Sequence, residues 1–432
     1  MNFLRRSLKR LLPWSVRKRI RYTAKMPLLW GFRRTIDALR ILHVLPSRAA
    51  PDSPMHLLIV NLTPYLGDTV MQIPMIEALR AANPGARIDY AVEESAAPLL
   101  RMMSELDNVY ALRLGRIPPV GLRPAMSRGL LVVREYWKHM RSCAPTVCLL
   151  PRWGDDLFRS MVLAYLTGAP RRIGFSWSVV ADARPAPYRD AFLTDICHGG
   201  RGQHEPIRFC HLANHAGLIP HAFLDRFSTG VVPSLQRIAA TPDWEQLAER
   251  LCVRADAPFA VIAPGASQPK RLWPLERWAD VMAELRTRGL HVVLLSGPSD
   301  ADLAHDLQKR SGGWASLAAG QTTLIESLAL LARAKLFIGN DSGPGHMAGS
   351  LGIPTVVLFV ATTEASPDDP NSSVRIRPVG PNVAECLPAR NLEPCQGACR
   401  AESAHCIRVI EVRDVLKAVD DLLDQRDAAA TV

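Results

Sequence analysis

No stretch of the sequence approaches the roughly 18 consecutive apolar residues that a membrane-spanning helix needs, so we expect no such helix. The first segment carries cations but neither a continuous apolar stretch nor a small-residue cleavage site, and we expect no signal peptide. The G-x-x-x-x-G-K-[ST] motif is missing, which excludes a P-loop. Gly343, Gly345 and Gly349 follow a G-x-G-x-x-x-G spacing, and no acid ends a strand about 20 residues later, so the dinucleotide fingerprint fails. A nicotinamide-dependent dehydrogenase is therefore not expected.

The cysteine pattern excludes a small disulfide scaffold. Nine cysteines, an odd number, are spread over 432 residues, and this usage favours a reducing cytoplasm. With 48% hydrophobic residues the chain is expected to be globular rather than disordered. Its length exceeds that of one ordinary core, so two domains are expected.

Acidic residues are scarce at one end of the chain. Residues 1–50 hold thirteen Lys/Arg and one acid, Asp37, a net charge of +12, whereas the other 382 residues carry a net charge of −1. Leucines recur at helical spacing among these cations until Pro13, and a second apolar stripe follows Pro27. Basic amphipathic helices suit an anionic membrane surface, so we predict membrane contact through residues 1–45. The alternative is that the second piece docks on the body of the protein; no motif supports a nucleic-acid partner.

The most informative stretch covers residues 330–359, LLARAKLFIGNDSGPGHMAGSLGIPTVVLF. The apolar run 336–338 predicts a strand, the small residues 346–351 predict a helix, and 355–359 predicts a buried strand. Parallel strands need such a crossover, and open α/β sheets bind ligands at the carboxyl ends of their strands. Because the turn before the helix offers free N–H groups and glycines, we expect a functional site here, with the N–H groups of residues 342–345 receiving a diphosphate.

Strand and helix patterns alternate through the rest of the chain, and the pattern restarts midway. Expected strands cover 56–62, 87–92, 146–150, 171–175, 259–263 and 290–296, and expected helices cover 69–82, 157–166, 203–216, 274–286, 300–310 and 411–423. Residues 113–128 and 176–203 are rich in Pro, Arg and Gly and are expected to be loops. The sequence predicts an α/β protein with a basic helical arm over 1–50 and doubly wound domains over 51–237 and 238–432.

Asp68 lies with Gly67 in the turn after the first strand of the first half. An Asp before a helix is often only an N-cap. A cap explains neither the preceding glycine nor the presence of Asp341 at the equivalent place in the second half. If the two sheets face each other across a cleft, Asp68 would be placed to act as a general base on an acceptor hydroxyl. The spacing leaves both roles open.

A second candidate anion site follows the first strand of the second half. Gly265 leaves that strand, and Lys270 and Arg271 precede the next helix. Glycine beside a strand end and two cations suit a pyrophosphate site, because the charge of a departing diphosphate must be stabilised. An ordinary loop with solvated cations is the alternative. The acidic pairs at 155–156 and 368–369 are not placed at strand ends and are expected to be surface acids.

Four cysteines gather near the C-terminus beside His405: they are Cys386, Cys395, Cys399 and Cys406. The C-x3-C-x6-C spacing of the last three is a loose metal-binding pattern. Buried or free thiols are the alternative, and the spacing does not decide between them.

The sequence resembles glycosyltransferase family 9, the bacterial ADP-heptose:lipopolysaccharide heptosyltransferase group. The resemblance covers about residues 56–423, everything except the arm, and the last of its four stretches is the most specific. The stretches are LLIVNLTPYLGDTVMQIPMIEALRAANPGARIDY from residue 57, HEPIRF at 204–209, VIAPGASQPKRLWPLERW from residue 261, and IGNDSGPGHMAGSLGIPTVVLF from residue 338.

This resemblance implies a GT-B fold, in which two Rossmann-like domains face each other across a cleft and the second holds most of the donor. It implies direct displacement with inversion and without a metal. By position, Asp68 matches the catalytic base, with Gly67 on the acceptor side. Positions that match the donor loop are Asp341, Ser342, Gly343 and His346. Gly265, Lys270 and Arg271 are placed at the diphosphate, and Thr322, Thr323 and Asp300 are placed near the nucleobase.

The chain departs from the family pattern in three places. The family usually has Lys-Arg-Trp-Pro, whereas Lys270 and Arg271 are separated from Trp273-Pro274 by Leu272, so either cation could be the diphosphate partner, with Lys270 slightly preferred. The strand after the donor loop usually ends in Gly-Pro-Thr, but residues 360–362 are Val-Ala-Thr. The basic arm is additional and would suit an acceptor embedded in the cytoplasmic leaflet.

The resemblance thus predicts an inverting, metal-independent glycosyltransferase without a cofactor. It would move heptose from ADP-heptose to a lipid-linked glycan such as the lipopolysaccharide core. The expected location is the cytoplasm, peripheral on the inner face of the bacterial inner membrane. The alternatives are a non-catalytic GT-B-like module that binds nucleotide sugars and a family member that uses a different nucleotide sugar.

Overall fold

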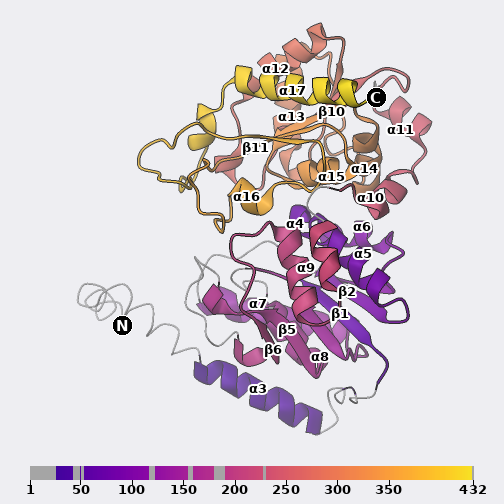
Figure 1. The fold of residues 1–432 in the computed structure, drawn as a ribbon, viewed down its shortest axis with the longest axis vertical. Coiled ribbons are helices and arrows are strands. Elements are labelled where there is room, and N and C mark those ends of the chain that lie inside the picture. The colour runs from indigo at the N-terminus through magenta and orange to yellow at the C-terminus, as the bar shows by residue number, and fades with distance from the viewer. Residues whose placement is uncertain are drawn as a thin grey trace.

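The computed structural model describes residues 26–41, 49, 53–115, 122–153, 159–179, 190–226 and 230–430. They form two lobes, indigo to magenta and orange to yellow in Figure 1, and each lobe is built on a six-stranded parallel sheet.

The first sheet has the strand order β3-β2-β1-β4-β5-β6. Its strands are β1 (His56–Asn61), β2 (Arg87–Glu93), β3 (Asn108–Leu112), β4 (Val147–Leu150), β5 (Arg171–Phe175) and β6 (Asp195–Cys197). The second sheet has the order β12-β11-β10-β7-β8-β9. Its strands are β7 (Phe259–Ala263), β8 (His291–Leu294), β9 (Ser316–Leu317), β10 (Leu336–Asn340), β11 (Thr355–Leu358) and β12 (Val383–Cys386).

Both sheets have the same topology. Counted from the first strand of each lobe, the order is 3-2-1-4-5-6, the doubly wound order whose ligand crevice opens where the order reverses. That reversal lies between β1 and β4 in the first lobe and between β7 and β10 in the second. The prediction of two Rossmann-like domains is therefore confirmed.

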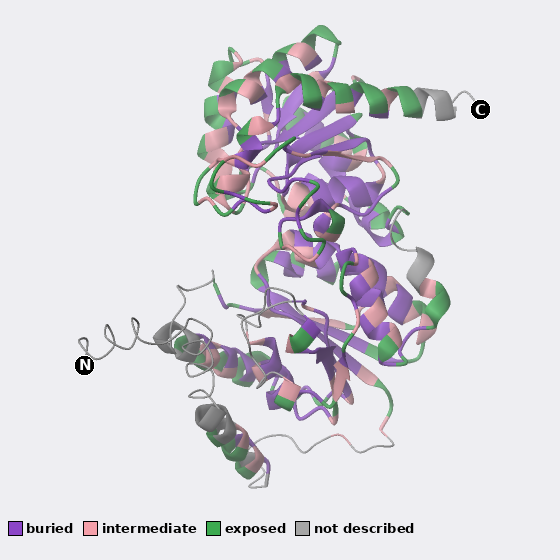
Figure 2. Cartoon of the chain, turned by 60° about the vertical axis from the view of Figure 1, so that its left-hand side comes forward, coloured by how far each residue is buried: buried purple, intermediate pink, exposed green. Residues whose placement is uncertain are grey.

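The burial of the strands and helices shows how each lobe is layered. All five residues of β7 and of β10 are buried, as parallel strands covered on both faces must be. Figure 2 shows these buried strands between helices whose outer faces are exposed. First-lobe helices are α4 (Leu66–Val70), α5 (Ile73–Ala82), α6 (Ala97–Arg101), α7 (Leu122–His139), α8 (Ser160–Thr167) and α9 (Glu205–His215). The following helices are α10 (Pro233–Ala239), α11 (Trp244–Arg250), α12 (Leu275–Thr287), α13 (Ala301–Arg310), α14 (Leu324–Arg333), α15 (Gly343–Leu351), α16 (Ser373–Ile376) and α17 (Val412–Ala430).

The passage between the lobes precedes α10. This helix contains the expected domain limit at 237/238 and packs against α14 and α15 of the second lobe. The last helix, α17, packs against β11, β12 and α12, so the chain also ends on the second lobe (Figure 1).

Two expected loops contain regular structure. Residues 122–128 open α7, and β6 lies inside 176–203, so both loop predictions are wrong at these places. In α7 the inward stripe, Val132 and Tyr136, lies C-terminal to the Pro- and Arg-rich start that suggested a loop. Strand β6 has only three residues and is specified by its pairing with β5, which composition does not reveal.

The second piece of the arm forms α3 (Met26–Ile41) and docks on the first lobe at its lower edge in Figure 1. Ile36 is buried, Arg33 Nη1 donates to Ala191 O at 2.9 Å, and Arg40 Nη2 donates to Leu166 O at 3.1 Å. For this piece the docking alternative is therefore the one observed. The first piece lies outside the described residues. No helix among the described residues is both long and apolar enough to span a membrane.

Candidate active site

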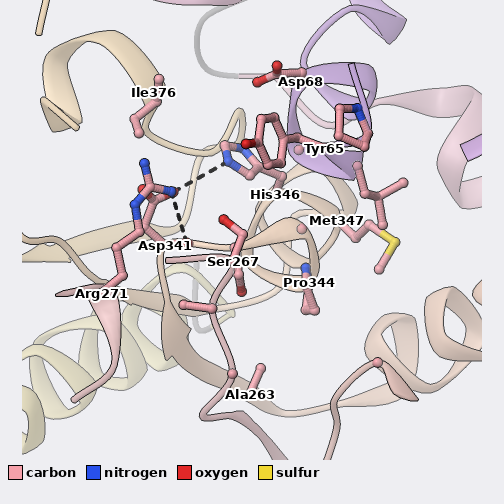
Figure 3. A pocket seen from close by; sticks show the side chains of 18 of the residues that line it. Tyr65, Asp68, Ala263, Ser267, Arg271, Asp341, Pro344, His346, Met347 and Ile376 are labelled. Atoms are coloured by element: carbon pink, nitrogen blue, oxygen red, sulfur yellow. Dashed lines mark hydrogen bonds and ion pairs between the residues drawn. The ribbon is translucent and has the colours of Figure 1, made fainter. Parts of the chain in front are cut away.

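A cleft of about 1060 Å³ lies between the lobes, at the carboxyl ends of β1, β4, β7 and β10. The first lobe contributes residues 64–68, Arg152 and Glu205, and the second contributes residues 265–269 and 341–344. Both topological switch points open into this space, which is large enough for a nucleotide sugar. Figure 3 shows Asp68 and Tyr65 on one side of it and Arg271, Asp341 and Ser267 on the other.

Asp68 lines the cleft and does not cap a helix. Helix α4 begins at Leu66 with Tyr65 as the N-cap residue, so Asp68 is the third helical residue and makes no cap bond. The N-cap alternative is therefore wrong. Its side chain is 32% exposed, and Oδ2 accepts a hydrogen bond from Arg152 Nη1 at 3.0 Å. Arg152 thus orients a carboxylate that still faces the cleft, as a base acting on a bound hydroxyl must.

On the opposite wall, Arg271 and Asp341 form a buried ion pair, with Nη1 and Oδ2 2.7 Å apart. Arg271 Nη2 also donates to Asn371 Oδ1 at 3.1 Å, which fixes the plane of the guanidinium. Burial raises the pKa of the Asp341 carboxyl, but Arg271 and then His346 outweigh it and hold the pKa below its ordinary value. The pair therefore presents a fixed, charged guanidinium to the cleft.

The start of α15 supplies fewer N–H groups than expected. Gly345 N–H and His346 N–H already donate to Ser342 O, at 3.1 and 3.4 Å, and Pro344 has no N–H. The prediction that the N–H groups from Ser342 to Gly345 receive a diphosphate is therefore wrong for Gly345 and untested for Ser342 and Gly343. Those of Ser342 and Gly343 remain at the positive end of the helix.

Several buried polar atoms around this helix start have no hydrogen-bond partner among the described residues, and they include Arg271 Nε, Ser342 Oγ and His346 Nδ1. An unpaired buried polar group costs free energy, so native structures rarely retain one without a reason. Three of them on one wall of a cleft indicate a place where an oxygen-rich ligand completes the bonding.

Two glycines allow the lobes to approach each other here. A Cβ at Gly67 would lie 2.6 Å from His346 Cδ2, and a Cβ at Gly343 would lie 3.1 Å from Leu66 Cβ. The close contact between helices α4 and α15 thus depends on the missing side chain at Gly67 and is tight at Gly343. Gly265 has a similar role within the second lobe, because a Cβ there would lie 2.6 Å from Asp300 Oδ2.

A buried network joins the lobes behind the cleft. Glu205 Oε1 of α9 accepts from Arg208 Nη1 at 3.1 Å and from Arg375 Nε of α16 at 2.5 Å. Arg208 Nη2 donates to Asp368 Oδ1 at 2.8 Å. Asp368 is thus an interlobe partner with an 11% exposed side chain, and the expectation of a surface acid is wrong for it. Residues 155–156 lie outside the described residues.

His204 extends this network as a neutral imidazole. Its Nε2 lies 2.7 Å from Arg377 O across the lobe boundary. Burial lowers the pKa of His204 to about 4, so the ring is uncharged near neutral pH. The HEPIRF stretch therefore connects the lobes, and its Glu205 and Phe209 also line the cleft, as does Arg375 of the network.

The two expected diphosphate cations have different environments. Arg271 lines the cleft, whereas Lys270 is not among its lining residues and its Nζ donates to Cys399 O at 3.0 Å. Burial, and then the neighbouring Arg271, lower the pKa of Lys270. The geometry thus favours Arg271 over Lys270, against the slight preference drawn from the sequence.

The two expected threonines also differ. Thr322 lines the cleft with Asp300. Thr323 caps α14 through a capping box, in which its Oγ1 accepts from Glu326 N at 3.2 Å and Glu326 Oε2 accepts from Thr323 N at 2.7 Å.

Comparison with known proteins accounts for this arrangement. The model of "Glycosyltransferase family 9 (heptosyltransferase)" matches residues 133–405. The chain belongs to glycosyltransferase family 9. It is 24% identical over 307 residues to lipopolysaccharide heptosyltransferase 2 of Salmonella typhimurium strain LT2, covering 68% of this chain and 80% of that relative. It is 27% identical over 304 residues to lipopolysaccharide heptosyltransferase 3 of Escherichia coli K12, covering 69% and 80%.

Solved structures agree on the fold of this family 9 glycosyltransferase. The E. coli ADP-heptose lipopolysaccharide heptosyltransferase II superposes with a TM-score of 0.61 at 20% identity, covering 86% of this chain and 100% of that one. The E. coli heptosyltransferase WaaC with ADP superposes with a TM-score of 0.61 at 18% identity, covering 85% and 99%. The predicted family, GT-B fold and enzyme class are confirmed.

Sequence reasoning did not find Arg152, the partner of Asp68, nor Glu205 and Arg375 as an interlobe pair. Arg152 follows β4, the neighbour of β1 at the switch point. Its position beside a strand end was the available signal, because strand order brings such ends together.

Proposed function

We propose that this family 9 glycosyltransferase moves heptose from ADP-heptose to a lipid-linked glycan, such as the lipopolysaccharide core, with inversion and without a metal ion at the reacting centre. The observation that carries the proposal is that candidate catalytic groups lie on both walls of the cleft. Asp68 lies on the first-lobe wall, and Arg271 with the start of α15 lies on the second. The relatives' names, lipopolysaccharide heptosyltransferases, support the choice of sugar and acceptor.

In the proposed reaction, the acceptor hydroxyl oxygen attacks the anomeric carbon from the side of Asp68, and the Asp68 carboxylate takes its proton. The bond from the anomeric carbon to the diphosphate oxygen breaks, and the diphosphate leaves with the electron pair. Arg271 and the N–H groups of Ser342 and Gly343 stabilise that charge, which is the part of catalysis that preorganised donors serve best. In this proposal Asp341 positions Arg271, and Thr322 and Asp300, which line the cleft, would contact the nucleobase.

Transfer with a defined donor and acceptor tests this function. Purified protein, ADP-heptose and core-truncated lipopolysaccharide should give ADP and an acceptor heavier by one heptose, measured by mass spectrometry. Transfer only from a UDP- or GDP-sugar would keep the fold and mechanism but replace the donor. Nucleotide-sugar binding with no release of nucleotide across a panel of acceptors would instead favour a non-catalytic module.

We also propose that the arm brings the enzyme to the inner face of the bacterial inner membrane, where a lipid-linked acceptor would lie. Residues 1–25 carry nine Lys/Arg and no acid, and each basic residue near an anionic surface contributes about 1 kcal/mol. A chain lacking residues 1–25 should bind phosphatidylglycerol-containing vesicles much less than the full chain in a flotation assay, with unchanged turnover on a water-soluble acceptor. Equal vesicle binding by both chains would exclude this role.

A further inference from the structure

Three cysteines and one histidine that the reaction does not use converge in the loop after β12. The Sγ atoms of Cys395, Cys399 and Cys406 and a ring nitrogen of His405 all lie within 4.8 Å of one another. Cys386, the fourth cysteine of the sequence pattern, is not in this cluster, and its Sγ points to Asp414 O at 4.0 Å. We call the converging four residues the Cys3His cluster.

The three nitrogen–sulfur distances in the Cys3His cluster match edges of a tetrahedron around a metal ion. His405 Nδ1 lies 3.6, 4.0 and 3.4 Å from the sulfurs of Cys395, Cys399 and Cys406. Zinc bonds of about 2.3 Å to sulfur and 2.0–2.1 Å to nitrogen, at tetrahedral angles, place sulfur and nitrogen about 3.6 Å apart. The three observed distances lie on either side of this value.

Hydrogen bonding alone does not account for this convergence. A neutral imidazole nitrogen has either one N–H or one lone pair in the ring plane. It can therefore form a hydrogen bond with one sulfur but not with three. Two backbone groups also donate to the sulfurs, Leu392 N–H to Cys406 and Arg400 N–H to Cys395, both at 3.4 Å. N–H donors around ligand atoms are the outer contacts that orient ligands and stabilise charge at metal sites.

The burial of the cluster supports a closed site. Cys399 and Cys406 are almost fully buried and Cys395 is 7% exposed, while the described backbone from 387 to 405 contains no helix or strand. A segment without regular structure has few backbone bonds to hold four side chains in one place. A bound ion supplies the missing constraint, because its binding free energy stabilises the fold.

We propose that the Cys3His cluster binds one structural metal ion of the kind that thiolates prefer, with Zn²⁺ as its ordinary occupant. Cys395, Cys399, Cys406 and His405 Nδ1 would fill all four positions, which leaves none for substrate, as in structural rather than catalytic zinc sites. The proposal rests on this geometry and not on the proposed transfer reaction.

The loop that the ion would hold supports the donor wall of the cleft. Cys399 O accepts from Lys270 Nζ at 3.0 Å, and Gly397 O accepts from Thr362 Oγ1 at 3.2 Å. Lys270 precedes Arg271, whose guanidinium faces the cleft. Loss of the ion is therefore expected to loosen the segment that carries Arg271 and to weaken donor binding without removing any group from the reaction.

Metal analysis of the full chain tests the proposal. Protein purified with a thiol reductant and then incubated anaerobically with Zn²⁺ and desalted should retain about one equivalent of zinc by mass spectrometry. Replacement by Co²⁺ should give the intense visible bands of tetrahedral cobalt with thiolate ligands. The C399S and C406S variants should lose the metal. The C252S and C386A variants, an exposed and a buried cysteine outside the cluster, should keep it.

Three results would overturn the proposal: less than about a tenth of an equivalent of any transition metal after reconstitution, equal metal loss in the control variants, or a disulfide between two cluster cysteines in the anaerobically reduced protein. If C399S and C406S fail to fold, the zinc content and cobalt spectrum of the unaltered chain decide. Because metal content is measured without substrate, a failed transfer reaction leaves this result untouched.

Discussion

Replacement of Asp68 by Asn should lower turnover about 10²–10⁴-fold, the usual contribution of a general base, with little change in ADP affinity. The amide keeps the size of the carboxylate but cannot take the acceptor proton. ADP binds against the second lobe in the proposed reaction, so its affinity should not depend on Asp68. Initial rates of ADP release and calorimetric titration with ADP measure the two quantities separately.

Two further variants separate a base from a structural partner. Asp256 is an exposed acid that does not line the cleft, and the D256N variant should retain unaltered turnover. If Asp68 served only to hold Arg152, an R152M variant would lose at least as much activity as D68N. We expect a smaller loss in R152M, because the base remains and only its orientation relaxes. Near-normal turnover in D68N would remove Asp68 from the mechanism.

Replacement of Arg271 by Met should have two large effects. Loss of a donor that stabilises transition-state charge typically lowers the rate about 10²–10³-fold. The change also removes the closer partner of Asp341, whose side chain is 4% exposed, and among the described residues leaves only His346, with Nε2 3.8 Å from Oδ1. Loss of one partner of a buried ion pair costs about 3–5 kcal/mol of stability. Urea unfolding and initial rates measure these effects in one protein preparation.

The pH dependence of the stability loss follows from the Asp341 carboxyl. In the unaltered chain its folded pKa is below the ordinary value of 3.8, so pairing stabilises the fold above that value and the contribution is lost as pH falls through the folded pKa. Loss of Arg271 removes the larger of the two influences that oppose burial, so the pKa of Asp341 rises relative to the unaltered chain, and lowering the pH protonates Asp341 and relieves the penalty. The destabilisation of R271M relative to the unaltered chain should therefore be smaller at pH 5 than at pH 7.5.

A double variant distinguishes the structural role of Arg271 from its catalytic role. R271M/D341N removes both charges and should recover much of the stability lost in R271M while remaining inactive. K270M is the matched control, because the Lys270 ammonium contacts a backbone carbonyl outside the cleft and should affect the rate far less. A larger rate loss in K270M than in R271M would restore Lys270 as the diphosphate partner.

The elements that could be predicted are those specified by residues close together in the sequence. The strand at 336–338, the glycine turn and the helix that follows were predictable because apolar period, glycine and proline act over a few residues. The resemblance placed Asp68 and Asp341 correctly on the two lobes. Asp68 was compatible with a cap only because the helix was expected to begin at residue 69, whereas α4 begins three residues earlier, at Leu66.

The remaining features depend on contacts between distant parts of the chain. Asp68 and Arg152 are 84 positions apart, and Arg208 and Asp368 are 160 apart. Spacing and composition do not specify such pairs, and a position beside a strand end, as for Arg152, becomes informative only once the strand order is known. The structure favours Arg271 over Lys270 for the same reason: the carbonyl that accepts from the Lys270 ammonium lies 129 positions away in the sequence.

The anomeric configuration of the product tests the central claim most directly. The enzyme would be given ADP-heptose of one defined anomeric configuration with core-truncated lipopolysaccharide, and the new linkage would be assigned by NMR. One displacement between Asp68 and Arg271 predicts the configuration opposite to that of the donor. A product that retains the donor's configuration would contradict the account, because attack from the Asp68 side could not produce it in a single step.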